Sequence, residues 1–215
     1  IKNKEKIITF VGKLNRAKGY DVFGSAIIEI LNKFKDWKAI VIGDEEREKI
    51  TFNHERLEIK GFKKHNDVIN ILKKTNIAVV CSRWQEPFGR TSLEASSCGC
   101  AVIITKRGGL PETITNGIIL ENLSKNNLYN SINNLILKKK YRKELQNLSL
   151  KNFNLTHSNA SQLVDNYRND ILQNTINHSD EFKKLKILHV TNFNERHNGR
   201  LFYNTGKRIN NGFVR

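Results

Sequence analysis

The sequence of 215 residues contains no methionine, two prolines and three cysteines. It also has no apolar run of the roughly 18 residues that a membrane-spanning helix needs, and its N-terminus lacks the pattern of a signal peptide. Cys81, Cys98 and Cys100 are odd in number and lack the spacing of metal ligands, which favours a reducing compartment over a disulfide scaffold. Because even position 1 is not methionine, we expect the chain to be a piece of a longer protein.

Acidic residues are scarce: 21 Asp and Glu stand against 37 Lys and Arg, a net charge of +16. Such an excess suits anionic partners, namely nucleic acid, an acidic lipid surface or phosphorylated metabolites. The chain has no basic helix with interleaved aromatics, which argues against nucleic acid, while membrane contact stays open. Because Asn, Ile and Lys are abundant together, we interpret the excess mainly as genome bias and as a solvated helix face. The densest basic cluster is Lys138, Lys139, Lys140, Arg142 and Lys143.

Residues 7 to about 122 alternate short apolar runs with segments of helical periodicity. Continuous apolar runs that end at glycines or loops are typical of a parallel sheet covered on both faces. The alternation predicts an α/β domain with a Rossmann-like, doubly wound parallel sheet, in which ligands bind beyond the carboxyl ends of the strands. The expected strands are 7–11, 39–42, 57–59 and 77–81, and the expected helices are 20–34 and one around 68–72.

The pattern becomes helical after residue 122, with amphipathic segments at 124–137, 139–151 and 157–173. We therefore assign residues 1–173 to one domain, residues 174–184 to a polar linker and residues 185–215 to the incomplete start of a second α/β unit. A piece as short as the last one cannot bury a core by itself. We expect it to pack on the first domain, to pair with another chain or to be disordered.

The loop after the first strand carries Gly12, Lys13 and Lys18. Both lysines are expected at the carboxyl edge of the sheet, close to a helix N-terminus. Two ammonium groups and a helix dipole together favour a diphosphate. The spacing is not that of a Walker loop, so a solvated basic loop remains the alternative.

A second loop, residues 82–95, leads from a strand through a Pro-Gly turn into a helix. Free amides of Phe88 to Thr91 suit a phosphate or a sugar oxygen. Glu86 in the loop and Glu94 in the helix flank these amides, and carboxylates accept from hydroxyl donors, which suits a sugar at one end and a ribose at the other. The alternative role of Glu94 is to offset the helix dipole.

A third loop, residues 105–112, again follows a strand. Its paired glycines, Gly108 and Gly109, allow a backbone to approach a ligand closely. Pro111 stands where a helix is expected to begin. We therefore expect all three loops to converge on one crevice at the carboxyl edge.

Together these segments resemble the C-terminal, donor-binding domain of the retaining glycosyltransferases of family 4, also called glycosyltransferase group 1, which have the GT-B fold. The likeness covers about residues 5 to 170. Glu86 and Glu94 are separated by seven residues, as in the family's Glu-x7-Glu signature. The matching pieces run in family order and are Gly12-Lys13, Lys18-Gly19, Gly43-Asp44, Gly61-Phe62, the run from Glu86 to Ala95, the run from Cys98 to Ile103, and the run from Gly108 to Glu112.

The resemblance implies transfer of a hexose from a nucleotide diphosphate sugar to a glycan or lipid-linked acceptor, with retained anomeric configuration. Glu86 would contact the donor sugar, and Lys18 and Lys13 would neutralise the diphosphate; these three are the candidate catalytic residues. The family usually has arginine at the position of Lys13, and lysine lacks its bidentate geometry. No metal and no cofactor are expected. The candidate donor-binding residues are Gly12, Phe88, Gly89, Arg90, Thr91 and Glu94, the last for the ribose hydroxyls.

Residues 185–215 resemble the first strand and loop of the N-terminal domain in the same superfamily, so we expect the chain to span the junction of two modules. The acceptor-binding domain of the first module would then be missing, and this piece would bind donor without turnover. We expect a bacterial cell-envelope enzyme in the cytoplasm, with peripheral contact at the inner face of the membrane. The alternatives are a non-catalytic GT-B assembly module and a nucleotide-sugar epimerase. The sequence leaves the sugar, base, acceptor, linkage and oligomeric state undetermined.

Overall fold

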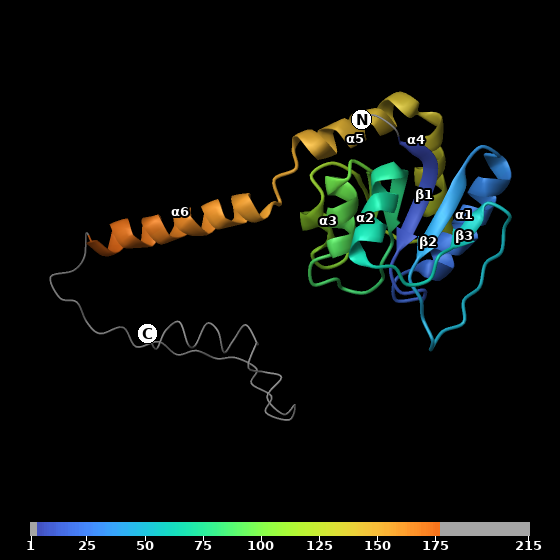
Figure 1. The fold of residues 1–215 in the computed structure, drawn as a ribbon, viewed down its shortest axis with the longest axis horizontal. Helices are drawn as coiled ribbons and strands as arrows, with labels where there is room; N and C mark the ends of the chain where they lie inside the picture. The colour runs from blue at the N-terminus through green and yellow to red at the C-terminus, as the bar shows by residue number, and fades with distance from the viewer. Residues whose placement is uncertain (1–3, 177–215) are drawn as a thin grey trace. The chain divides into compact units, whose positions relative to one another are not determined.

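The computed structural model describes residues 4–176, and a six-stranded sheet forms its centre (Figure 1). The strand order is β3-β2-β1-β4-β5-β6 and every pairing is parallel. The chain therefore reverses its direction of travel across the sheet between β1 and β4, which confirms the predicted Rossmann-like, doubly wound fold. The strands are β1 (Glu5–Val11), β2 (Lys38–Ile42), β3 (Leu57–Ile59), β4 (Thr75–Val80), β5 (Ala101–Thr105) and β6 (Ile118–Leu120).

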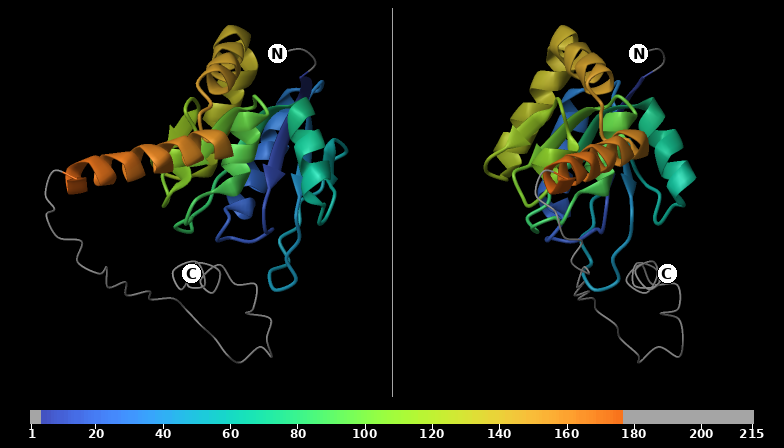
Figure 2. Two further views of the ribbon diagram at one scale, coloured as in Figure 1. Left: turned by 60° about the vertical axis from the view of Figure 1, so that its left-hand side comes forward. Right: turned by 90° about the vertical axis from the view of Figure 1, so that its left-hand side faces the viewer.

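Helices cover both faces of the sheet, with α1 and α4 on one face and α2 and α3 on the other (Figure 2). Successive side chains of a strand point to opposite faces, so Ile7 and Ile8 of β1 belong to two separate apolar clusters. None of the helices within residues 4–176 has the length and apolar composition that crossing a membrane requires. The helices are α1 (Tyr20–Lys33), α2 (His65–Lys74), α3 (Arg90–Ser97), the short 3-10 helix η1 (Leu110–Thr113), α4 (Lys125–Leu137), α5 (Lys139–Lys151) and α6 (His157–Ile176).

The C-terminal part of the described chain is helix α6. One compact unit extends as far as residue 163, which lies within that helix. Helix α6 continues to Ile176, into the segment 174–184 that the sequence predicts as a linker, because no glycine or proline interrupts it there. The remainder of that segment and the predicted second α/β unit at 185–215 lie outside the described residues.

The expected solvated face of the basic cluster at the start of α5 is confirmed for its lysines and wrong for Arg142. Arg142 is only 6% exposed. Its guanidinium carbon lies 5.1 Å from the centre of the Trp37 ring, and its Nη1 donates to the carbonyl oxygens of Leu135 and Ile136 at 2.6 and 3.1 Å. Arg142 therefore holds the end of α4 against α5, while the neighbouring lysines are exposed.

Candidate functional site

The ends of β1 and β2 meet through glycine backbone at the carboxyl edge of the sheet. The N–H of Gly12 donates to the carbonyl of Ile42 at 2.9 Å. Gly43 has a φ of 134°, and a Cβ at this position would lie 1.9 Å from the carbonyl oxygen of Gly12. A side chain at Gly43 would therefore separate the two loops, and the loop after β1 would lose its support.

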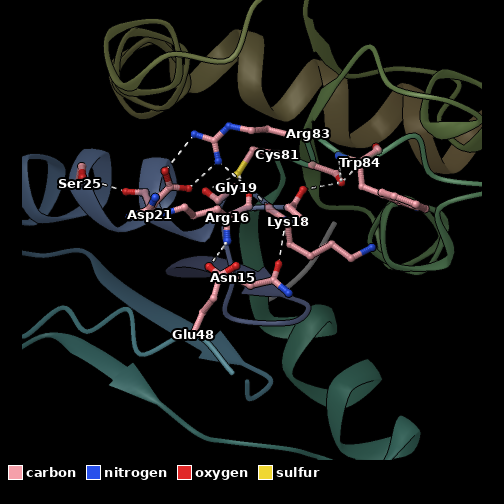
Figure 3. A network of polar contacts seen from close by, with 12 residues as sticks. Asn15, Arg16, Lys18, Gly19, Asp21, Ser25, Glu48, Cys81, Arg83 and Trp84 are labelled. Atoms are coloured by element: carbon pink, nitrogen blue, oxygen red, sulfur yellow. Dashed lines mark hydrogen bonds and ion pairs between the residues drawn. The ribbon is translucent and has the colours of Figure 1, made fainter. Parts of the chain in front are cut away.

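A network of polar contacts joins the loop after β1 to the loop after β4 (Figure 3). The carbonyl of Ala17 accepts from the N–H groups of Arg83 and Trp84 at 2.8 and 3.1 Å. The guanidinium of Arg83 donates to both carboxylate oxygens of Asp21, at 2.7 and 2.9 Å, and to the carbonyl of Arg16 at 2.6 Å. Burial opposes ionisation of Asp21, but the hydrogen bonds and charge of Arg83 hold its pKa below the usual value. The backbone that precedes α1 is thereby fixed.

Lys18 and Glu86, which are 68 residues apart in the sequence, form an ion pair. The N–H of Lys18 donates to Oδ1 of Asn15 at 3.0 Å, and the lysine side chain extends away from the Arg83–Asp21 pair (Figure 3). The two charged side chains are partly buried, with 30% and 13% of their surfaces exposed. They line one small cavity of about 70 Å³, together with Phe10, Val11, Gly12, Val80, Ser82, Gly89, Arg90 and Thr91.

The N-terminus of α3 forms another wall of this cavity. Its N-cap residue, Gly89, has a φ of 94°, and no side chain caps the helix. The first-turn N–H groups, including those of Arg90 and Thr91, are therefore available to an anion or a sugar oxygen. A Cβ at Gly89 would lie 2.6 Å from Cδ2 of Leu110, which explains why glycine is needed here.

The paired glycines of the third loop support the Glu86 loop. A Cβ at Gly108, whose φ is 54°, would lie 2.2 Å from the carbonyl oxygen of Glu86. The N–H of Gly109 donates to that same oxygen at 2.7 Å, and the N–H of Gly108 donates to Oε1 of Gln85 at 2.6 Å. The sequence predicts a close approach to a ligand, whereas the close approach in the structure is to the loop that carries Glu86.

Glu94 lies in the second turn of α3 and does not line the cavity that Lys18 and Glu86 share. Its carboxylate is 18% exposed and is 3.5 Å from Nδ1 of His65 and 3.7 Å from Nη2 of Arg90. His65, at the first position of α2, is a contact that the sequence did not reveal, because α2 and α3 are far apart in the chain. Two predicted glutamates thus occupy different surroundings.

Lys13 and Phe88 also lie outside the small cavity. Lys13 is exposed, and no ion pair of its side chain is found within residues 4–176. The ring of Phe88 is 43% exposed and lines a separate apolar cavity with Leu93 and Leu155. Of the nine predicted site residues, six therefore line the small cavity and three do not: Lys13, Phe88 and Glu94.

The cysteines are free thiols, and burial raises the pKa of Cys81 and Cys100 to about 12. Such thiols stay protonated near neutral pH and are poor nucleophiles. In the described part of the chain, no group of three or more His, Cys, Asp or Glu side chains could hold a metal ion. The charged residues that line the small cavity are Lys18, Glu86 and Arg90, and the N-terminal amides of α3 form one of its walls.

The fold and this site define the class of protein to which the chain belongs. The structure superposes on the C-terminal domain of a glycosyl transferase group 1 family protein from Francisella tularensis with a TM-score of 0.61 and 28% identity. The match covers 70% of this chain and 85% of that one, so the fold is the Rossmann-like domain of GT-B glycosyltransferases. The sequence model of the family described as glycosyl transferases group 1 matches residues 1–151, and the chain belongs to that family.

Curated relatives include enzymes with named activities. The D-inositol 3-phosphate glycosyltransferase of Corynebacterium jeikeium is 30% identical over 128 residues, which are 53% of this chain and 30% of that protein. The lipopolysaccharide core biosynthesis mannosyltransferase LpsB of Rhizobium meliloti is 29% identical over 123 residues, 53% of this chain and 35% of that protein. The chain spans about a third of the length of these curated relatives.

Proposed function

We propose that this domain binds the nucleotide diphosphate sugar of a retaining family 4 glycosyltransferase that transfers a hexose during synthesis of a bacterial cell-envelope glycan. The observation that carries the proposal is the cavity in which Lys18 and Glu86 lie beside the uncapped N-terminus of α3. The names of the relatives from Corynebacterium jeikeium and Rhizobium meliloti support transfer of a sugar.

The chemistry of the cavity suits a leaving diphosphate. When the bond between the sugar and the diphosphate breaks, negative charge accumulates on the diphosphate oxygens. The ammonium of Lys18 and the amides of Arg90 and Thr91 stabilise the transition state, in which this charge develops, more strongly than they stabilise the bound donor. This difference accelerates the step. We propose that these groups make a metal ion unnecessary and that Lys13 approaches the diphosphate from its exposed position.

Glu86 has a second role in the proposal. As an acceptor-only carboxylate it binds hydroxyl groups of the donor sugar. In the structure it is paired with Lys18, so a diphosphate that takes over the lysine releases the carboxylate for the sugar. Binding of the diphosphate and binding of the sugar are thereby coupled through one ion pair.

Glu94 is proposed to accept from the ribose hydroxyls, with His65 and Arg90 holding its carboxylate in place. The cavity belongs to one domain and is proposed to bind only the donor. We propose that acceptor binding and turnover also need an N-terminal domain of the same longer protein. The proposed setting is the cytoplasmic face of the membrane, and the proposed acceptor is a glycan or a lipid-linked sugar.

Calorimetric titration of the chain with UDP, GDP and ADP tests the donor site. We expect one nucleotide to bind with a Kd of about 1 μM to 1 mM, the range typical of enzyme substrates. In Lys18→Ala the loss of a charge-assisted hydrogen bond, about 1.5–3 kcal/mol, should weaken binding roughly 10- to 100-fold. Glu94→Ala should also weaken it, because a ribose contact is lost.

Lys35→Ala is the matched control, since Lys35 is an exposed lysine in the loop between α1 and β2. This variant should bind as the unchanged chain does. Absence of binding to all three nucleotides, or an equal loss in Lys18→Ala and Lys35→Ala, would contradict the donor site. In a longer chain that includes the N-terminal domain, release of free nucleotide from the donor distinguishes transfer from epimerisation, which alters the sugar and releases none.

A further inference from the structure

A basic cavity of about 400 Å³ lies at the amino edge of the sheet, where β1 and β4 begin and α5 crosses (Figure 1). This is the edge opposite to Lys18 and Glu86. Five of its lining residues are basic and none is acidic. The lining residues are Lys4, Lys6, Asn76, Lys139, Arg142, Lys143, Gln146 and Asn147.

Two of the basic residues are already engaged by the protein. Nζ of Lys4 donates to the carbonyls of Leu72 and Cys98 at 3.0 and 2.7 Å. Lys6 forms an ion pair with Asp36. These contacts leave Lys4 and Lys6 little capacity for a further anion.

Lys139 and Lys143, in contrast, are exposed and have no ion pair or hydrogen bond of their side chains within the described residues. They stand one turn apart on α5, so their side chains lie on the same side of the helix. Two like charges in such positions repel each other mildly, and a bound anion would remove that repulsion.

Arg142 supplies a buried group without a partner. Its Nη1 donates to two carbonyl oxygens of α4, but its buried Nε has no hydrogen-bond partner among the described residues, and none is found for its Nη2. Because Nε has almost no accessible surface, Nη2 is the guanidinium nitrogen left to an anion in the cavity, through a charge-assisted hydrogen bond. Burial lowers the pKa of Arg142, as expected for a guanidinium that lacks an anionic neighbour.

The start of α5 adds a backbone donor. The N-cap residue, Lys138, provides no side-chain cap, and the first turn contains no acidic residue. The N–H of Lys139, which lines the cavity, therefore has no partner within the helix, and the helix dipole favours an anion at this end.

The wall of the cavity is fixed by buried hydrogen bonds. Nε2 of Gln146 donates to the backbone carbonyl and to Oδ1 of Asn76, at 2.9 and 3.0 Å, and Nδ2 of Asn76 donates to the carbonyl of Glu5 at 2.7 Å. These bonds tie α5 to the first residues of β4 and β1. The part of the wall formed by Asn76 and Gln146 is thus held in place.

We propose that this cavity is a second anion site, which binds a phosphate group through Lys139, Lys143 and Nη2 of Arg142. It lies about 20 Å from the donor cavity, since β1 has seven residues and a strand rises about 3.3 Å per residue. Its ligand is a phosphorylated small molecule or the phosphate of an acidic lipid headgroup, which share the chemistry that the site recognises.

Amide NMR spectra of the ¹⁵N-labelled chain, titrated with inorganic pyrophosphate, test this site directly. We expect the backbone amides of Lys139, Lys140 and Tyr141 and the Nε–H of Arg142 to shift in a saturable manner. Lys139→Gln/Lys143→Gln should weaken that binding at least about fivefold while shifts at Gly12 and Thr91 persist. Shifts confined to Gly12, Thr91 and their neighbours would overturn the proposal and leave the donor site intact.

The control variant is Lys140→Gln/Lys151→Gln, which removes the same charge from α5 without touching the cavity lining. An equal loss of pyrophosphate affinity in both double variants would show that only net charge matters and would overturn the site. Cosedimentation with phosphatidylglycerol and phosphatidylcholine vesicles then separates the sources. Binding to phosphatidylglycerol vesicles that is lost only in Lys139→Gln/Lys143→Gln supports a lipid headgroup, and pyrophosphate binding without vesicle binding supports a small molecule.

Discussion

The two edges of the sheet both gather basic side chains, but they leave them in different electrostatic states. At the carboxyl edge Lys18 is paired with Glu86. At the amino edge Lys139 and Lys143 have no such partner within the described residues, and Arg142 uses only part of its guanidinium. An anion must therefore compete with a carboxylate for Lys18, whereas no acidic residue lines the cavity at the amino edge.

The edges also differ in how their walls are held. At the carboxyl edge backbone meets backbone, as where Gly108 packs on the carbonyl of Glu86 and Gly43 packs on Gly12. At the amino edge side chains carry the contacts, as where Gln146 donates to Asn76. We therefore expect that a methyl group added to a glycine of the carboxyl edge lowers the free energy of unfolding more than the loss of a surface charge at the amino edge does.

The largest effect is expected for Gly108→Ala. Its new Cβ would lie 2.2 Å from the carbonyl oxygen of Glu86 at a φ of 54°, so we expect a loss of about 2–3 kcal/mol in the free energy of unfolding. Gly61→Ala is the matched control, because Gly61 has a similar φ of 62° but no atom within 4 Å of the added Cβ. Urea unfolding measures both, and equal losses would mean that the contact with Glu86 costs nothing.

A smaller effect is expected for Arg142→Leu at the amino edge. The carbonyls of Leu135 and Ile136 would lose their donor, and leaving buried acceptors unpaired costs about 2 kcal/mol. Lys143→Gln, which changes an exposed side chain of the same helix, should stay within about 0.5 kcal/mol of the unchanged chain. If thermal or urea unfolding gave the two variants the same stability, Arg142 would not be joining α4 to α5.

The smallest effect concerns pH and the Arg83–Asp21 pair. The pKa of Asp21 in the folded chain lies below its usual value of 3.8, so the pair stabilises the fold above that pH. The gain disappears as pH falls through the lower, folded-state pKa. The unchanged chain should therefore be more stable than Asp21→Asn at about pH 6, and this difference in stability should be smaller at about pH 2. Urea midpoints at the two pH values measure this, and a difference independent of pH would contradict it.

Most of the fold could be predicted from the sequence because buried parallel strands leave a clear pattern of continuous apolar runs. The strand β6 was not predicted, since its three residues Ile118–Leu120 are too few to form a distinct run. Helix α5 was predicted, but the burial of Arg142 was not. Its burial depends on Trp37 and on the carbonyls at the end of α4, which no local pattern relates to residue 142.

The pattern of buried strands also allowed part of the candidate site to be predicted. Glycines and charged residues after strands indicate which loops meet at the carboxyl edge, and Lys18, Glu86 and Thr91 do line one cavity. The spacing of residues could not show that Lys18 pairs with Glu86, that Arg83 binds Asp21 or that Gly108 supports the Glu86 loop. Each of these contacts joins segments that follow different strands.

The Lys18–Glu86 ion pair also determines how the carboxyl edge responds to ionic strength. Added salt weakens the attraction of an anion to Lys18, but it equally weakens the hold of Glu86, the competitor that the anion must displace. The two losses partly cancel, so we expect anion affinity at this edge to fall less with salt than at the amino edge. Lys139 and Lys143 have no carboxylate to release, and affinity at the amino edge falls steeply as salt rises. A carboxylate inside a cationic site thus makes the anion affinity of that site less sensitive to salt concentration.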